Sequence, residues 1–157
     1  MAVLLPQAEG IPLPRPTPVS APFWDGCGRG ELLFQRCKCC DKAVFPPALQ
    51  CRYCGTAELG WERSGGKGSV YSWSVVSRPQ TPAFTIPYVA AIVDLDEGYQ
   101  VLSNIIGCDP ADICLGIRLR VEFHEIGENV HLPYFRPDIA QAGRLARTRT
   151  RIWQEGF

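Results

Sequence analysis

The sequence predicts a mainly β protein, and three observations support this class. Residues 69–76 and 117–124 alternate between two kinds of side chain, the period of a β-strand. Glycine-containing turns separate these and other apolar segments. The first 22 residues contain six prolines, which exclude a helix or a central strand there.

Residues 1–21 are expected to form a proline-rich, extended arm, because proline fixes φ and removes a backbone donor. Two alternatives stay open. The composition favours a disordered tail, whereas a functional arm would become ordered against a partner. The apolar start of the arm ends at Pro6 and has no positive charge before it, so it does not resemble a signal peptide. We therefore expect a cytoplasmic protein without a membrane span.

A short, interrupted helix is predicted within residues 22–34. Pro22 suits the first helical turn, and three glycines that follow weaken any longer helix. The aromatic pair Phe23 and Trp24 would serve as core or interface anchors.

The segment 36–55 holds five of the eight cysteines. Cys37 and Cys40 form one C-x-x-C pair, and Cys51 and Cys54 form another after ten intervening residues. Two facing pairs supply the four thiolates of a tetrahedral zinc site of the rubredoxin-like ribbon type. Iron would accept the same four ligands. Disulfide or redox use is disfavoured, because a cytoplasmic protein keeps its thiols reduced and a redox motif needs only one pair.

Such a closed site leaves no open position for water or substrate, so the metal is expected to be structural. Gly55 and Asp41 follow the two pairs, at positions where a left-handed backbone is expected. Cys39 should point away from the metal. The scattered Cys27, Cys108 and Cys114 are expected to be small buried hydrophobic residues.

Residues 65–137 are predicted to form five strands, with a tight turn at residues 96–98. A short helix between the third and fourth strands would begin at Asp109 and Pro110 and end at Gly116. This order matches an OB-fold barrel, and an SH3-like barrel or an open sandwich is the alternative. The implied domains are the arm, a helix and ribbon at 22–64, the barrel at 65–137 and an Arg-rich tail at 138–157.

The composition disfavours a partner held mainly by charge. Sixteen basic residues balance 16 acidic ones, and the isoelectric point is near 6.7, whereas nucleic-acid binders carry excess positive charge. A single-stranded nucleic-acid binder stays an alternative, because Tyr71 and Trp73 could stack on bases. Their apolar neighbours instead predict that both belong to the core. Neither histidine, His124 or His131, lies in a recognisable catalytic motif, so we predict no catalytic residues.

Several motifs together resemble a known family. They are PFW near residue 22, CKCC, FPP and CRYCG within 37–55, GKGSVYSWSVV at 66–76, the long segment 87–123 and LPYFRP at 132–137. The chain resembles the acyl-CoA-associated family of zinc-ribbon and OB-fold accessory proteins, long catalogued as a domain of unknown function. It departs from that family at Asp41, where glycine is usual, and in its long arm.

The resemblance implies an accessory subunit that binds a thiolase-fold or hydratase-type enzyme acting on CoA thioesters. The partner reaction would be acyl transfer or retro-aldol side-chain cleavage, as in steroid degradation. Aromatic and arginine residues dominate many interfaces, and the candidate partner contacts are Phe23, Trp24, Phe45, Pro46, Pro47, Arg144 and Arg147. A further alternative is direct acyl-CoA binding, in which the phosphates would meet Arg78, Arg118 and Arg120.

Overall fold

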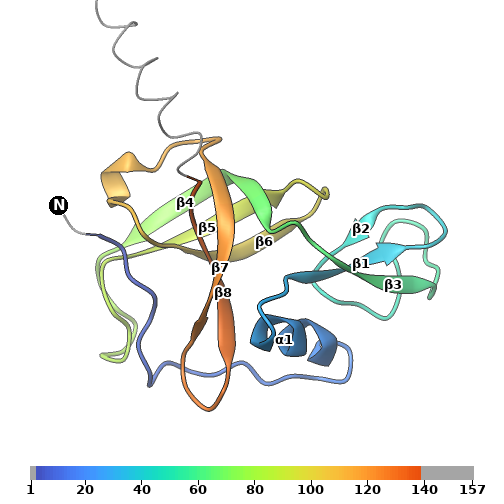
Figure 1. The fold of residues 1–157 in the computed structure, drawn as a ribbon, viewed down its shortest axis with the longest axis horizontal. Coiled ribbons are helices and arrows are strands. Elements are labelled where there is room, and N and C mark those ends of the chain that lie inside the picture. Colours follow the sequence, from blue (N-terminus) through green and yellow to red (C-terminus); the bar gives the residue numbers. More distant parts are fainter. Residues whose placement is uncertain (1–2, 139–157) are drawn as a thin grey trace, which may run out of the picture.

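The computed structural model describes residues 3–138 of the 157-residue chain. Within that range, a three-stranded sheet and a closed five-stranded barrel lie side by side, and a single α-helix lies beneath their junction (Figure 1). The predicted mainly β class is confirmed. None of the described helices is long and apolar enough to cross a membrane.

The arm, residues 3–20, contains no helix or strand and runs along the barrel (Figure 1). Leu4 joins it to the loop after β6 through two backbone hydrogen bonds, Leu4 N–H to Cys108 O and Gly107 N–H to Leu4 O, each 2.9 Å long. Gln7 and Ile11 are also buried. The arm is thus ordered against the barrel of the same chain. This arrangement differs from both alternatives drawn from the sequence, a disordered tail and an arm that becomes ordered against a partner.

Helix α1 (Ala21–Gly28) follows the arm and has the proline in its first turn that the sequence predicted. Phe23 and Cys27 point into the core. The helix ends in the glycine-containing segment. Glu31 N–H bonds back to Gly26 O, and the chain then reverses direction and enters β1.

The three-stranded sheet consists of β1 (Leu33–Cys37), β2 (Ala43–Val44) and β3 (Leu59–Arg63), in the antiparallel order β2-β1-β3. The barrel consists of β4 (Lys67–Val76), β5 (Tyr88–Leu95), β6 (Gln100–Ile105), β7 (Arg118–Glu125) and β8 (His131–Pro137). Its closed order is β4-β5-β6-β8-β7, and β6 with β8 is the parallel pair. This is the connectivity of an OB-fold, so that prediction is confirmed over the SH3-like and sandwich alternatives.

The predicted helix after β6 is one 3-10 turn, η1 (Pro110–Asp112). Asp109 caps it as expected, since its carboxylate accepts from Ala111 N–H at 2.9 Å. The extension to Gly116 is wrong. Gly116 N–H bonds to Val70 O at 2.9 Å, and Val70 N–H bonds to Ile117 O at 3.0 Å. The segment therefore satisfies its backbone against β4 and does not continue as a helix.

A β-bulge in β4 overturns the predicted burial of Tyr71 and Trp73. Val70 pairs with Val93 and Ser72 pairs with Ile92, which leaves Tyr71 as the extra residue. Tyr71 is 53% exposed and Trp73 is 39% exposed. The prediction that both are core residues is wrong. Strand β4 continues beyond its pairing with β7, which ends at the pair Ser69 and Arg118, so β7 does not cover this part of β4.

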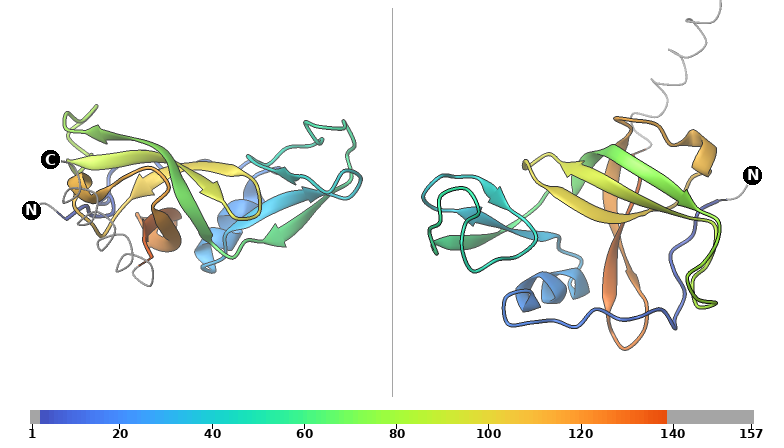
Figure 2. Two further views of the ribbon diagram at one scale, coloured as in Figure 1. Left: turned by 90° about the horizontal axis from the view of Figure 1, so that it is seen from above. Right: turned by 180° about the vertical axis from the view of Figure 1, so that it is seen from behind.

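The two sheets share one hydrophobic core that also includes α1 and Leu4 of the arm. Phe34 of β1 stacks on Tyr99, the residue just before β6, with ring centroids 4.9 Å apart, and Phe45 lies 5.3 Å from the same ring. These contacts hold the cysteine-bearing sheet firmly against the barrel. Figure 2 shows this junction from above and from behind.

Candidate metal centre and partner-binding groove

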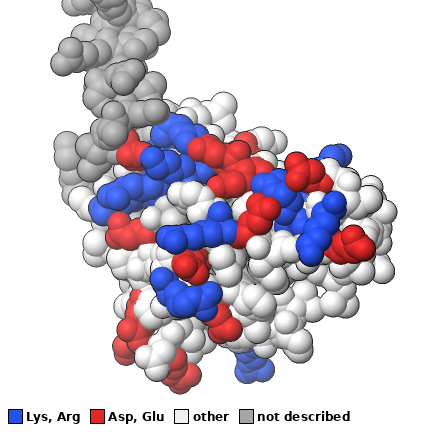
Figure 3. Space-filling view, turned by 45° about the vertical axis from the view of Figure 1, so that its right-hand side comes forward, with Lys and Arg blue, Asp and Glu red and all other residues white. Residues whose placement is uncertain are grey.

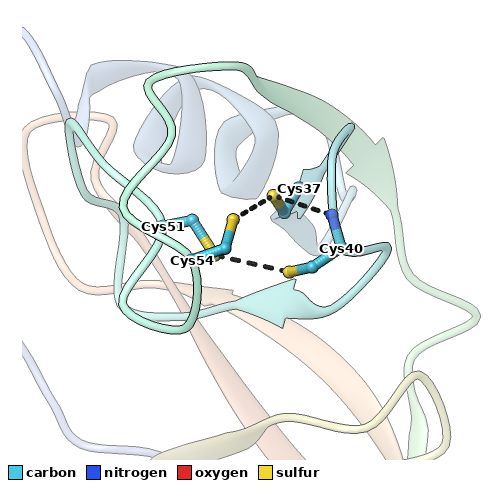
Figure 4. A group of neighbouring side chains, drawn as sticks. All are labelled: Cys37, Cys40, Cys51 and Cys54. Atoms are coloured by element: carbon cyan, nitrogen blue, oxygen red, sulfur yellow. Dashed lines mark hydrogen bonds between the residues drawn. The ribbon is translucent and has the colours of Figure 1, made fainter.

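The two C-x-x-C pairs face each other beside the three-stranded sheet (Figure 4). Cys37 ends β1 and Cys40 lies in the turn that leads to β2, while Cys51 and Cys54 flank the turn before β3. Each pair belongs to one tight turn, so the C-x-x-C spacing alone places its two sulfur atoms close together.

The four sulfur atoms lie within 4.8 Å of one another. Cys37 Sγ is 3.5 Å from Cys54 Sγ, and Cys40 Sγ is 3.7 Å from Cys51 Sγ (Figure 4). A tetrahedral ion with metal–sulfur bonds of about 2.3 Å separates its sulfurs by about 3.8 Å. The predicted ligand set is therefore positioned for one metal ion, and the donor chemistry fits a structural site.

The two turns repeat the same backbone pattern. Asp41 N–H bonds to Cys37 O at 2.9 Å, and Gly55 N–H bonds to Cys51 O at 2.8 Å. Asp41 and Gly55 have positive φ values of 59° and 77°. The left-handed positions predicted from the sequence are thus both present, and aspartate occupies one of them without changing the turn.

Backbone N–H groups also point at the sulfurs. Cys40 N–H donates to Cys37 Sγ at 3.4 Å, and this bond lowers the pKa of the Cys37 thiol to about 7. Tyr53 N–H donates to Cys51 Sγ at 3.4 Å. The contact at Cys37 favours the thiolate form, which is the metal-binding form.

The remaining cysteines behave as separate groups. Cys39 is exposed and lies outside the cluster. Cys27 is fully buried, and burial raises its pKa to about 12. Cys108 and Cys114 are half-buried, so they are less enclosed than the sequence suggested.

An apolar groove lies on the outer face of the barrel, between the arm, α1 and the loop after β2. Its volume is about 690 Å³. Five of the predicted partner contacts line it together, namely Phe23, Trp24, Phe45, Pro46 and Pro47. The other two, Arg144 and Arg147, lie outside the described residues.

The groove is also lined by residues that sequence reasoning missed. Gln7 and Ile11 come from the arm, and Leu102, Leu132 and Tyr134 come from β6 and β8. Leu102 is 73% exposed between the outward-facing Gln100 and Asn104. An apolar residue among the polar residues of this strand face was the one sequence feature that could have indicated the groove. The residues that line the groove include no charged side chain. It covers the strand face on which OB-folds bind their ligands.

The three arginines proposed for CoA phosphates do not form one cluster. Arg118 and Arg120 share the outer face of β7, but Arg118 already makes a bidentate ion pair with Asp96 at 2.8 and 2.6 Å. Arg120 is level with Lys67 at the start of β4, whereas Arg78 follows its far end. The ten residues of β4 correspond to a contour of roughly 30 Å.

The charged side chains form mixed groups. Figure 3 shows basic and acidic residues interleaved on one face of the molecule. His124 is half-buried and lies 2.7 Å from Glu122, which also accepts from Arg136 at 2.8 Å. This network ties the histidine to a structural ion pair.

Comparisons with known proteins agree with this architecture. Residues 24–60 match the family model described as "ChsH2, rubredoxin-like zinc ribbon domain", and residues 61–124 match "ChsH2, C-terminal OB-fold domain". A solved structure titled "Ltp2-ChsH2(DUF35) aldolase" superposes with a TM-score of 0.75 and 32% identity, over 80% of this chain and 99% of that chain.

Three curated relatives are similar in sequence. A "Probable enoyl-CoA hydratase alpha subunit" of Thermomonospora curvata is 35% identical over 120 residues, which is 76% of this chain and 38% of that protein. The "3-oxo-4,17-pregnadiene-20-carboxyl-CoA hydratase alpha subunit" of Mycobacterium tuberculosis is 33% identical, over 64% of this chain and 32% of that protein. A "DUF35 domain-containing scaffold protein" of Methanothermobacter thermautotrophicus is 35% identical, over 64% of this chain and 77% of that protein. The chain thus spans about a third of the length of the two hydratase subunits.

Proposed function

The chain belongs to the ChsH2 (DUF35) family of zinc-ribbon and OB-fold proteins, and from this premise we propose that it is a non-catalytic accessory subunit of an enzyme that acts on CoA thioesters. The partner would be a thiolase-fold or hydratase-type protein. Relatives support this class, since one is part of an aldolase named for two proteins and two are hydratase alpha subunits. The proposed substrate class is a CoA thioester of a steroid side chain, because the name of the mycobacterial relative includes a pregnadiene carboxyl-CoA.

The metal in this proposal is zinc in a purely structural role. Four thiolates at tetrahedral spacing suit it, and a Cys₄ site has no open position for substrate. The ion would fix the turns around Cys37 and Cys51, and with them the loop that carries Phe45. Elemental analysis of the purified chain tests this assignment against iron, and about one zinc per chain is expected.

The single observation that supports partner binding is the apolar groove that unites the predicted contacts. Interface cores are depleted in charge and enriched in aromatic residues, and this groove has both properties. Its proposed occupant is an uncharged, apolar segment of the partner enzyme. Trp24, Pro46 and Leu102, which line the groove, would contact that segment, while the partner supplies the reacting groups.

A matched pair of substitutions tests the groove. Leu102→Asp places a charge in the groove, and Leu49→Asp places the same charge on the metal-bearing lobe at a site that is equally exposed, 75% against 73%. We expect Leu102→Asp to abolish co-purification of the CoA-thioester enzyme with the tagged chain, and Leu49→Asp to leave it unchanged. Equal capture by both variants, or an enzyme that is fully active and stable alone, would refute the proposal.

The two alternatives have less support. Direct CoA binding would require Arg118 to leave Asp96, and calorimetry with acetyl-CoA is expected to show little heat. For single-stranded nucleic acid, Tyr71 and Trp73 are exposed, but no Lys or Arg lies between residues 68 and 77. A gel shift with oligonucleotides at low salt is expected to be negative.

A further inference from the structure

The second half of β4 has an unpaired edge. Its register with β5 runs from Gly68 to Val76, but its register with β7 stops at Ser69. Among the described residues, the backbone of 72–76 pairs with β5 and with nothing else. Figures 1 and 2 show this end of β4 on the side of the barrel away from the three-stranded sheet.

The hydrogen-bonding pattern shows which groups are free. Asp96 N–H bonds to Lys67 O, whereas Leu95 N–H bonds to Tyr99 O, so the even-numbered residues of β5 face β4. Tyr88, Ala90 and Ile92 therefore bond to their partners Val76, Ser74 and Ser72. The N–H and C=O groups of Trp73 and Val75 point away from β5, toward the open edge.

This edge lacks the protection that proteins give to exposed strands, such as charge, proline or short length. The two edges of the three-stranded sheet have it, since β2 contains only two residues and β3 includes Glu62 and Arg63. Residues 68–76 of β4 carry no charge and no proline. Trp73 is 39% exposed and Val75 is 43% exposed along the same edge.

We infer that two copies of this chain pair through this edge, antiparallel and centred on Ser74, to form a symmetric dimer. Trp73 and Val75 lie on either side of Ser74, so a twofold axis there places each opposite the other residue of the second copy. All four outward backbone groups of each edge then find partners. Each exposed Trp73 side chain meets a Val75 across the strands, a favourable aromatic and β-branched pair.

The proposed groove lies over β6 and β8 and reaches β5 at Tyr88 and Ala90, but it includes no residue of β4, so the paired edge itself is not part of it. The inference is also independent of the accessory function, since it depends only on the strand edge. The uncharged edge needs a strand that is itself uncharged and has its free groups two residues apart. The same edge on a second copy meets both conditions.

Charge exchange at the twofold axis tests the inference by sedimentation velocity on the full chain. The wild type is expected to be dimeric. Ser74→Lys and Ser74→Glu, each alone, bring like charges face to face and should weaken dimerisation by about tenfold or more. An equal mixture of the two variants should restore the dimer, while Gln50→Lys, an exposed change on the metal-bearing lobe, should not weaken it.

Metal content and far-ultraviolet circular dichroism of each variant confirm that it folds. A wild type that is monomeric at every concentration overturns the inference. So does a dimer that both Ser74 variants retain, or a mixture that remains monomeric. If Ser74→Lys instead abolishes capture of the enzyme by a monomeric wild type, the edge belongs to the partner and the second copy is excluded.

Discussion

The side-chain amide of Gln7 forms hydrogen bonds with both backbone groups of Thr85. Its oxygen accepts from Thr85 N–H at 2.8 Å, and its nitrogen donates to Thr85 O at 3.1 Å. The Gln7 backbone N–H also donates to Tyr134 Oη at 3.2 Å. One buried amide thus joins the arm to the loop between β4 and β5, where no strand pairing is available.

Gln7→Ala is expected to release the arm. The substitution leaves the backbone groups of Thr85 without their partner, a loss of about 1–3 kcal/mol for buried polar groups. Limited proteolysis should then cut between residues 8 and 20 faster than in the wild type. Glu9→Ala, an exposed neighbour, is the control and should leave the cleavage rate unchanged. Equal rates for both variants would show that the amide does not hold the arm.

Two glycines of α1 should respond to the same substitution with opposite sign. At Gly26 a Cβ would lie 2.8 Å from Leu33 Cγ and 2.9 Å from Glu31 O, whereas at Gly28 it would meet nothing within 4 Å. Gly28→Ala should raise the free energy of unfolding by up to about 1 kcal/mol. Gly26→Ala should lower it by about 1–3 kcal/mol. Denaturant titration of both variants provides the measurement, and a shared sign would contradict the packing of α1 on β1.

Removing one sulfur ligand should empty the metal centre. Cys51→Ser is expected to lose the bound ion and unfold the three-stranded sheet, because three thiolates do not close the site. Cys39→Ser removes the exposed thiol within the same turn and should keep the full metal content. Elemental analysis with near-ultraviolet circular dichroism distinguishes the two variants. Metal loss in Cys39→Ser would show that Cys39, and not Cys40, is the second ligand of this turn.

The left-handed residues of the two turns predict a second pair of opposite effects. Gly55→Ala should lower the stability of the metal-bound protein by about 1–2 kcal/mol, through backbone strain alone, since its Cβ would meet nothing. Asp41→Gly should raise that stability by up to about 1 kcal/mol for the converse reason. Thermal unfolding with saturating metal measures both, and a destabilising Asp41→Gly would reveal a role for the carboxylate.

The ion pair between Asp96 and Arg118 predicts a pH effect. The hydrogen bonds from Arg118 hold the pKa of Asp96 below its ordinary value. A lowered carboxyl pKa contributes stability above the unfolded pKa near 4, and this contribution disappears as the pH falls through the folded value. Nuclear magnetic resonance should show Asp96 titrating at a higher pH in Arg118→Gln than in the wild type. Identical titration curves would exclude the pair in solution.

The sequence predicted features that depend on a few neighbouring residues. The ligand set followed from the spacing of Cys37, Cys40, Cys51 and Cys54, and the cap at Asp109 followed from local turn chemistry. The barrel order followed from strand alternation and from the position of the short helix.

The features that failed depend on contacts distant in sequence. Tyr71 and Trp73 are exposed because a bulge shifts their register and β7 stops short, and neither fact is encoded in the alternation of 69–76. The arm contains prolines that favour disorder, yet Leu4 and Gln7 find buried partners about 80 to 130 residues later. The groove combines five separate segments, so only its predicted aromatic and proline contacts could be found from the sequence.

The compactness of the cysteine cluster in the sequence has a consequence for biosynthesis. All four sulfurs lie between residues 37 and 54, whereas the barrel closes only when Ser69 meets Arg118. A chain emerging from the ribosome can therefore capture its ion while most of the barrel is still untranslated. During that interval Tyr99 is not yet available to cover the ring of Phe34. A slow supply of metal or a translational pause would therefore expose an aggregation-prone aromatic surface on the nascent polypeptide.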